Sequence, residues 1–324
     1  MPRFALLACA LLACVFAGAE KKAAAQFGAQ PVKIVFPFGA GGNGDAVSRF
    51  IGERVQAETG QSVVIDDHPG AGGIMGAMAV KSAPADGTTL MLAPFTLMSI
   101  FPHIYPDLKY DPVKDFEPVS QVATFEFSLV AAASTPAKTV AELVDLLKRD
   151  PAMGGFGSPG AGSLPHFLGV AFARAAGVEL RHVPYRGTAA ALTDLVAGQI
   201  PLAILPTSDV IEYAKLGQIR ALATFGARQS LYLPRTPTLR AAGYDVAGDG
   251  WFALYAPGGT PAATIDRINK IVAGLARSQA FRDRLSKLGL EATGTTPSEL
   301  AALQQEELAK YGPLVKASGF KPTE

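Results

Sequence analysis

Short apolar runs rich in β-branched residues alternate with helical patterns along most of this chain. In the N-terminal third, strands are predicted at 32–36, 62–65 and 88–93, and helices at 45–58 and 74–82. Strands that alternate with helices in this way are typical of parallel sheets covered by helices. The alternation therefore restricts the fold to the α/β class and predicts an opening βαβαβ unit.

The pattern repeats after a connection rich in Pro and Asp at 105–117. A strand is predicted at 127–132, followed by a helix at 139–149 that Thr139 and Glu142 would start as a capping box. The remaining elements are strands at 181–184, 202–205 and 221–224, and helices at 164–176, 189–197 and 208–216. Together these elements predict a second α/β unit.

The chain ends with an apolar strand at 251–256 and two predicted helices. Thr260 and Thr296 are expected to be their N-caps, because each precedes a proline, which suits the first helical position. Glu299 would complete a capping box with Thr296. If the strand rejoins the first unit, the chain crosses between the two units twice.

The two units predict a two-domain clamp with a central ligand cleft. Domain 1 would consist of residues 26–131 and 250–324, and domain 2 of residues 132–249. A chain of 324 residues is long enough to bury a core in each domain.

Residues 1–25 predict a secretory signal peptide. Arg3 precedes an apolar run at 4–18, and small residues suitable for cleavage follow. A membrane span would need about 20 apolar residues, and this run is shorter. We expect cleavage before Gln26, with a lipid anchor on Cys14 as the alternative. The mature protein is therefore expected to be exported.

Cysteine usage and charge exclude several function classes. Both cysteines, Cys9 and Cys14, lie in the leader, so the mature chain would have no disulfide, thiolate nucleophile or cysteine-bound metal. The formal net charge is +1, and Lys and Arg form no cluster. Nucleic-acid binding needs clustered positive charge and is disfavoured.

A glycine-rich loop joins the first predicted strand to the first predicted helix. Residues 39–44 match the dinucleotide pattern G-x-G-x-x-G, and Asp66 and Asp67 follow about twenty residues later. Two features disfavour an NAD-dependent dehydrogenase: Pro37 stiffens the loop, and an exported protein has no ready supply of nicotinamide cofactor. The loop nevertheless suits an anion, because glycines allow close approach and a helix N-terminus offers free N–H groups.

A second loop of this kind lies at 157–163 and also precedes a predicted helix, with Ser163 as the expected N-cap. If the two helix N-termini faced each other, they could hold a carboxylate. Each loop alone could equally be an ordinary tight turn.

No enzyme signature accompanies the loops. The sequence has no nucleophile elbow and no P-loop, and no metal-ligand spacing occurs among its histidines, His68, His103, His166 and His182. We therefore predict no metal, no cofactor and no catalytic residue. His166 beside the second loop, and Tyr185 with Arg186 at a strand end, could contact a ligand or be purely structural.

Four motifs follow one another in a specific order. They are IVFPFGAGG from Ile34, DHPGAGG from Asp67, the pairs Gly157-Ser158 and Gly162-Ser163, and VPYRG from Val183. In this order and spacing they resemble the tripartite tricarboxylate transporter receptors, the Bug solute-binding proteins. The resemblance extends from about residue 31 to the C-terminus.

The resemblance implies a periplasmic binding protein of type II-like architecture, in which two hinge strands join two α/β domains that close on a small carboxylate. It implies binding without catalysis, and an inner-membrane partner that is either a tripartite tricarboxylate-type transporter or a signalling protein. Both glycine loops would grip the ligand, and segment 93–96 and the region of Tyr185 would line the cleft. With the candidates above, the predicted ligand-binding residues are Phe38, Gly39, Ala40, Gly41, Gly42, Asn43, Asp45, Thr96, Ser158, Gly160, Ala161, Gly162, Ser163, His166, Tyr185, Arg186 and Asp209.

Two departures from the family pattern bear on the ligand. Segment 94–98 is less polar than in many relatives, and Leu205 with Pro206 stands where an acidic residue often ends the strand. An acid there would suit an ammonium group. The departures therefore favour an aliphatic or aromatic carboxylate over an amino acid, while Asp209 could supply a polar contact or cap the next helix.

Overall fold

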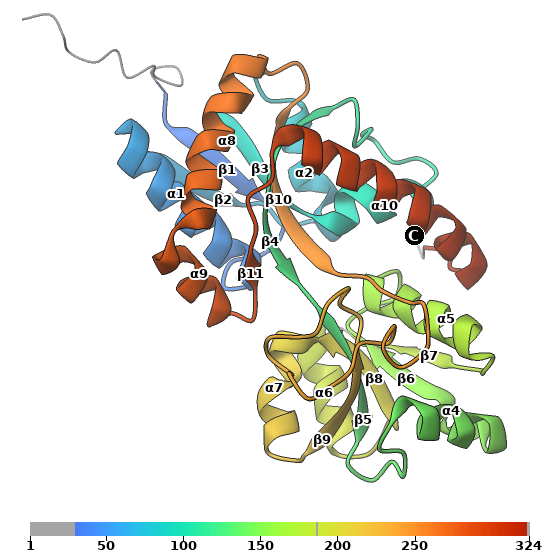
Figure 1. Cartoon of the computed structure of the whole chain (residues 1–324). Helices are drawn as coiled ribbons and strands as arrows, with labels where there is room; N and C mark the ends of the chain where they lie inside the picture. Colours follow the sequence, from blue (N-terminus) through green and yellow to red (C-terminus); the bar gives the residue numbers. More distant parts are fainter. Residues whose placement is uncertain (1–29, 186, 323–324) are drawn as a thin grey trace, which may run out of the picture.

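The computed structural model describes residues 30–185 and 187–322. The predicted signal peptide and Arg186 lie outside these residues. Two sheets define two lobes, which lie one above the other in Figure 1. Lobe 1 contains a six-stranded sheet of order β11-β4-β10-β3-β1-β2, and lobe 2 a five-stranded sheet of order β7-β6-β8-β5-β9.

Lobe 1 combines both ends of the described chain. Its strands are β1 (Val32–Phe36), β2 (Val63–Asp67), β3 (Thr89–Pro94), β4 (Phe116–Phe125), β10 (Gly250–Pro257) and β11 (Glu291–Ala292). Its helices are α1 (Asn43–Thr59), α2 (Ile74–Lys81), α3 (Phe101–Ile104), α8 (Ala262–Arg277), α9 (Gln279–Ser286) and α10 (Pro297–Ser318), with short helical turns η1 (Ala71–Gly73) and η2 (Thr96–Ile100).

Lobe 2 is formed by the middle of the chain. Its strands are β5 (Phe127–Ala132), β6 (Gly155–Ser158), β7 (Arg181–Pro184), β8 (Leu202–Pro206) and β9 (Ile219–Thr224). Its helices are α4 (Val140–Arg149), α5 (Leu164–Ala176), α6 (Thr188–Val196) and α7 (Thr207–Lys215), with the turn η3 (Pro151–Gly154).

Helices cover each sheet through apolar faces. In α1, Val47, Ile51 and Val55 recur at every fourth position, and all three are buried. They join a core cluster with Ile34 and Leu90 of the central strands. Side chains four residues apart share one face of a helix, so the sequence spacing alone determines which face of α1 packs on the sheet. No helix in the described part of the chain is long and apolar enough to cross a membrane.

The chain passes between the lobes twice. The first crossing is short: β4 ends at Phe125 in lobe 1, and β5 starts at Phe127 in lobe 2. The second is the long segment between β9 and β10. The sequence predicts residues 127–131 in domain 1, but β5 pairs with β8 and β9 in the sheet of lobe 2.

The strand β4 is the main element that the sequence does not predict. Part of it falls in the expected connection at 105–117, and Pro118 argues against a central strand because it donates no ladder hydrogen bond. In the structure, the pairing register with β10 shifts between Leu254 and Tyr255, and Pro118 lies opposite Tyr255 at this irregularity. A bulge is a place where a sheet tolerates proline.

Three expectations about helix starts are also wrong. Glu142 accepts a hydrogen bond from the N–H of Lys138 instead of Thr139, so only the Thr139 half of the capping box forms. Thr260 does not cap α8, because its hydroxyl donates to the carbonyl of Pro257. Between the two expected C-terminal helices, Ser278 starts a third helix, α9. The capping box of Thr296 and Glu299 is confirmed.

Candidate functional site

Strand direction brings the predicted ligand loops to facing edges of the two lobes. β1, β2 and β3 run parallel, and β10 is antiparallel to both β3 and β4, so β4 runs with the first three strands. Since β4 ends at the crossing, the carboxyl ends of β1 to β3 lie at the inter-lobe edge. In lobe 2, β5 starts at the crossing and is antiparallel to β8. β6 and β7 run parallel to β8. Their carboxyl ends therefore face lobe 1, and ligands of open α/β sheets bind at such ends.

The helices that begin at these edges have uncapped N-termini. No side chain caps the first turn of α1, α2, α5, α6 or α7. Side chains do cap α4, α9 and α10, none of which follows a strand ending at the inter-lobe edge. The helix α8 starts elsewhere and is also uncapped. The inter-lobe edges thus collect helix N-termini that have no side-chain cap and carry partial positive charge.

In the first loop, Asp45 holds the backbone. Its carboxylate accepts a 2.8 Å hydrogen bond from the N–H of Gly41 and pairs with Arg49 at 2.7 Å. Asp45 is 6% exposed, whereas the glycines at 39, 41 and 42 are exposed. Gly41 has a φ of +90°, which favours glycine. Asp45 is therefore buried beneath the loop and stabilises its backbone, whereas the loop glycines lie at the surface.

The second loop is also held by its own polar groups. The hydroxyls of Ser158 and Ser163 donate to the carbonyl of Gly160, at 3.0 Å and 2.6 Å. Ser163 occupies the N-cap position of α5, but its hydroxyl does not cap the helix as we expected. The first-turn N–H groups of α5 consequently remain without a side-chain acceptor.

Two stacked histidines support this loop from inside lobe 2. The rings of His166 and His182 lie 3.9 Å apart, and His166 Nδ1 accepts a 3.2 Å hydrogen bond from the N–H of Gly162. His182 Nε2 and Ser158 Oγ share a 2.7 Å hydrogen bond. Burial lowers the pKa of His166, and burial and the neighbouring imidazole lower the pKa of His182 to about 4. The pair is neutral at neutral pH, and His166 is a support for the loop at 7% exposure.

We expect acid to destabilise the protein through this pair. Because both pKa values are lowered on folding, the stability that the neutral pair contributes is present above about pH 6.5 and is lost as the pH falls towards the folded values. A His166→Asn, His182→Asn double variant should lose less unfolding free energy than the wild type between about pH 7 and about pH 4.5. Urea unfolding at both pH values measures this, and equal losses would contradict it.

A recess of about 570 Å³ between the lobes joins two of the predicted residues. Asn43 of lobe 1 and Asp209 of lobe 2 line it together with Ser208. Asn43 Nδ2 donates to the carbonyl of Leu288 at 3.4 Å, which fixes its amide at the edge of lobe 1. Burial raises the pKa of Asp209, while hydrogen bonds from Thr188 and Ser208 lower it. The recess thus places one carboxyl group among helix N-termini.

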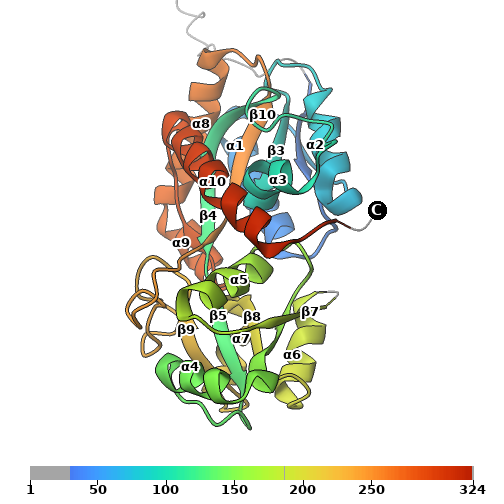
Figure 2. The ribbon, with the colours of Figure 1, turned by 90° about the vertical axis from the view of Figure 1, so that its right-hand side faces the viewer.

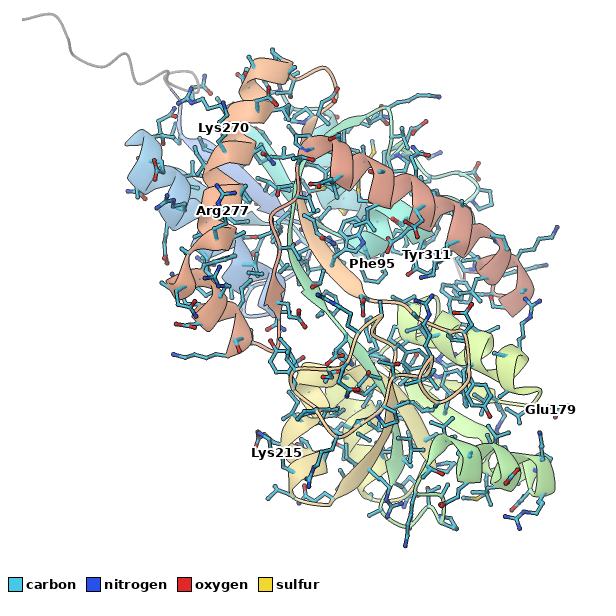
Figure 3. The ribbon with its side chains drawn as sticks, in the orientation of Figure 1. Phe95, Glu179, Lys215, Lys270, Arg277 and Tyr311 are labelled. Carbon is cyan, nitrogen blue, oxygen red and sulfur yellow. The ribbon has the colours of Figure 1, made fainter. Side chains whose placement is uncertain are left out.

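The other predicted residues that the structure describes do not line this recess. Phe38 is half-buried, and its ring lies 5.7 Å from Phe36. Thr96 opens η2 directly after β3, next to the buried Phe95, which Figure 3 shows beneath α10. Tyr185 donates to Asp194 at 2.8 Å, so its hydroxyl already has a partner. Contact of these residues with a ligand stays a prediction.

Sequence reasoning missed the C-terminal contribution to the second loop. The ring of Phe320, just after α10, lies 5.7 Å from His166 and 6.1 Å from Phe167. A methyl group on Gly162 would lie 2.8 Å from Phe320. Figures 1 and 2 show α10 reaching from lobe 1 to α5 of lobe 2. The polar end of α10 gives no sequence signal for this contact.

The features needed for nucleotide or metal chemistry do not assemble. Asp67, which would have to bind a nucleotide ribose, lies 3.4 Å from Arg49 in an ion pair. Among residues 30–185 and 187–322, no group of three or more His, Cys, Asp or Glu side chains could hold a metal ion.

Comparison with known proteins gives consistent matches. The model of the tripartite tricarboxylate transporter family receptor matches residues 47–320. A UPF0065 protein of Bordetella bronchiseptica is 31% identical over 322 residues, which cover 99% of this chain and 95% of that protein. Among solved structures, an R. palustris protein with adipate has a TM-score of 0.79 at 31% identity, covering 91% of this chain and 99% of that one. MatC from Rhodopseudomonas palustris with bound malate has a TM-score of 0.74 at 28% identity, covering 89% and 99%.

Proposed function

This chain belongs to the tripartite tricarboxylate transporter receptor family, and on this basis we propose that it captures a small carboxylate between its lobes and delivers it to a transporter of the tripartite tricarboxylate type. Membership makes it a periplasmic solute-binding protein with the fold of that family, and a receptor instead of an enzyme. The nature of the ligand, the partner and the binding residues is the proposed part.

One observation carries the carboxylate proposal: the uncapped helix N-termini at the facing edges of both lobes. The N–H groups of such termini bind anions without a buried cation. The solved relatives with adipate and malate support an aliphatic dicarboxylate as the first ligand class to test.

The proposed mechanism is closure. A carboxylate held by the α1 terminus of lobe 1 gains contacts with the α5 and α7 termini of lobe 2 only when the cleft is closed. That difference in affinity shifts the population from open to closed lobes, and the partner reads the closed form. In this proposal the two lobes are the two domains, and the chain crosses from one to the other at Glu126 and again before Gly250. Residues 1–25 would be the signal peptide.

A thermal-shift assay of the chain from Gln26 tests the proposal. We expect malate or adipate to raise the melting temperature by a few degrees, because saturation at 100 times the dissociation constant adds about 2.7 kcal/mol of stability. Amino acids, aromatic acids and nicotinamide cofactors are the comparison set. A shift with a nicotinamide cofactor alone would overturn the proposal, and binding without any effect of gene deletion on uptake would favour a signalling partner over a transporter.

A further inference from the structure

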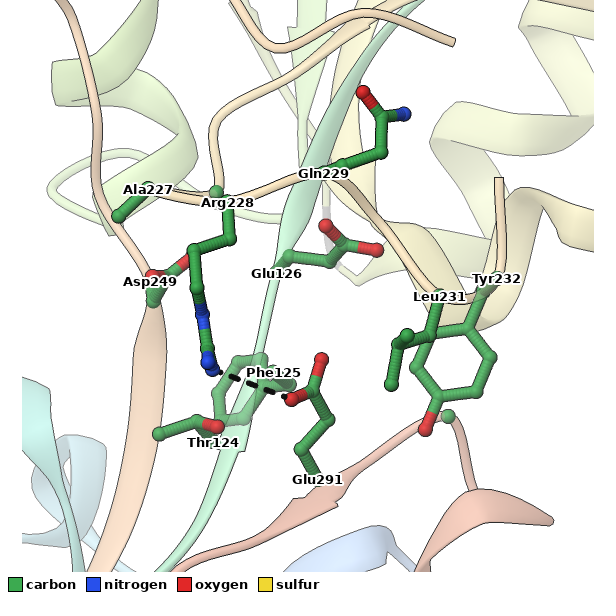
Figure 4. A pocket seen from close by; sticks show the side chains of 12 residues that line it. Thr124, Phe125, Glu126, Ala227, Arg228, Gln229, Leu231, Tyr232, Asp249 and Glu291 are labelled. Atoms are coloured by element: carbon green, nitrogen blue, oxygen red, sulfur yellow. Dashed lines mark ion pairs between the residues drawn. The ribbon is translucent and has the colours of Figure 1, made fainter. Parts of the chain in front are cut away.

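A pocket of about 300 Å³ lies at the hinge itself (Figure 4). Lobe 1 and both crossings line this hinge pocket, which consists of Thr124, Phe125, Glu126, Gly226, Ala227, Arg228, Gln229, Leu231, Tyr232, Asp249, Gly289 and Glu291. In Figure 2, the loop that follows β9 lies on the left of the hinge strands, whereas α2 and α6 lie on the right. The hinge strands therefore separate this loop from the loops at the start of α2 and α6.

Each crossing carries a carboxylate that faces the hinge pocket. Glu126 is the residue between β4 and β5, and Asp249 directly precedes β10. A methyl group on Gly226 would lie 3.1 Å from Glu126 Oε2 and 3.6 Å from Asp249 Oδ1, so the two carboxylates flank this glycine. Glu291 of β11 adds a third carboxylate from lobe 1.

One pocket wall belongs to lobe 1 and the other to the second crossing, which is hydrogen-bonded to Thr224 of lobe 2 through Pro237 and Leu239. Arg228, in the loop after β9, pairs with Glu291 of lobe 1 at 3.7 Å. Tyr232 of the same loop donates a 2.9 Å hydrogen bond to the carbonyl of Leu290. Rotation of one lobe against the other must therefore change the width of the hinge pocket.

Few neighbouring groups stabilise a negative charge on Glu126. It is 9% exposed, and the hydroxyl of Ser230 donates to it. Burial raises its pKa to about 7; the Ser230 hydrogen bond lowers the pKa, and Asp249 and Glu291 raise it. The phenol of Tyr232 is the other titratable group that faces it.

More neighbouring groups stabilise a negative charge on Asp249. Burial raises its pKa to about 6, and the N–H of Ala227 accounts for the largest opposing effect. Lys310 of α10 and Arg228 also lower its pKa, while Glu291 raises it. The buried Glu307 and Tyr311 of α10 face it as well.

We infer that Glu126 and Asp249, with Glu291 beside them, form a charge-operated hinge, in which ionisation of Glu126 and Asp249 favours the closed cleft and their protonation favours the open cleft. The hinge strands lie between the pocket and the loops at the start of α2 and α6, so bringing these two helices together moves the pocket walls apart. Like charges repel one another most when the pocket is narrow, and widening relieves this repulsion. This inference rests on the proposed function. If both hold, the affinity for the carboxylate should rise with pH by about fivefold or more.

The test measures the lobes directly, without any carboxylate. The described residues contain no cysteine, so Ala79→Cys on α2 and Ala190→Cys on α6, both exposed, accept a pair of spin labels. The label distance should shorten between about pH 5 and about pH 8, as Glu126 and Asp249 ionise. The shift should disappear in Glu126→Gln and shrink in Asp249→Asn.

The matched control is Glu307→Gln. Glu307 is also buried with a pKa raised to about 7, but it does not line the hinge pocket: it accepts from Trp251 within lobe 1 and affects Asp249 through its charge alone. Its variant should keep the shift. A distance that is the same at both pH values, or a shift that survives in both hinge variants or vanishes in Glu307→Gln, overturns the inference. Titration of the same proteins with adipate and malate separates the two proposals. A pH-dependent distance without binding of either acid would contradict the proposed function and leave the hinge inference standing.

Discussion

A Trp251→Ala variant should lose about 3–5 kcal/mol of unfolding free energy, the largest stability change we expect in the chain. Trp251 is the second residue of β10, directly after the second crossing, and is 1% exposed. Its ring lies 6.2 Å from that of Phe95. Truncation leaves a large cavity next to the hinge, since packed strands on both sides prevent full collapse.

The variant also removes a hydrogen bond that a buried carboxylate needs. Trp251 Nε1 donates to Glu307 Oε2 at 2.9 Å, and Glu307 is 7% exposed. Burial raises the pKa of Glu307 to about 7, and the hydrogen bond from Trp251 lowers it. Because this pKa is raised on folding, the stability that Glu307 contributes is full below about pH 4.5 and is lost as the pH rises through about 7.

Trp251→Phe separates the two effects. It keeps most of the apolar volume but leaves Glu307 without the indole donor, and a charge-assisted hydrogen bond is stronger than a neutral one. Its cost should therefore be larger at about pH 8 than at about pH 5, while Trp251→Ala should be costly at both. Urea unfolding at the two pH values measures the difference. An equal cost of Trp251→Phe at both would show that the hydrogen bond to Glu307 is not important.

Where periodicity and turn residues agree, the sequence predicted the elements closely. β1, β5 and α5 have the predicted bounds. Prolines flank β1 on both sides, and Pro165 and Gly177 mark the ends of α5. The strand β4 was missed because Pro118 is acceptable only at a bulge, and a bulge is produced by pairing with β10, which lies far along the chain.

The same division holds for the site. The place of Asn43 and Asp209 among the ligand-binding candidates could be predicted from the sequence, and the structure brings both to one recess. The roles of Asp45 and Ser163 could not, because both side chains could reach either a ligand or their own loop. The structure directs them to Gly41 and Gly160. Glu126 and Asp249 carry no motif and become neighbours only through the two crossings.

A Gly162→Ala variant should weaken carboxylate binding by more than about tenfold. Gly162 is buried and has a φ of +74°, a conformation that costs an alanine about 1–2 kcal/mol. Its added methyl group would lie 2.8 Å from the Phe320 ring and 3.5 Å from Ile104 Cδ1. The loop must therefore move, which displaces the N-terminus of α5 and the hydrogen bond to His166.

Gly155→Ala is the matched control, because Gly155 starts β6, the same strand that leads into this loop. Its added methyl group would be in ordinary contact at 3.7 Å, and its φ is −68°. Calorimetry with whichever of malate or adipate gives the larger thermal shift should find wild-type affinity for Gly155→Ala. Adding Phe320→Ala to Gly162→Ala removes the clash and retains the backbone strain, so it should restore binding only in part. Full affinity in Gly162→Ala itself would show that the second loop does not hold the ligand, because neither its backbone nor its contact with Phe320 would then matter for closure.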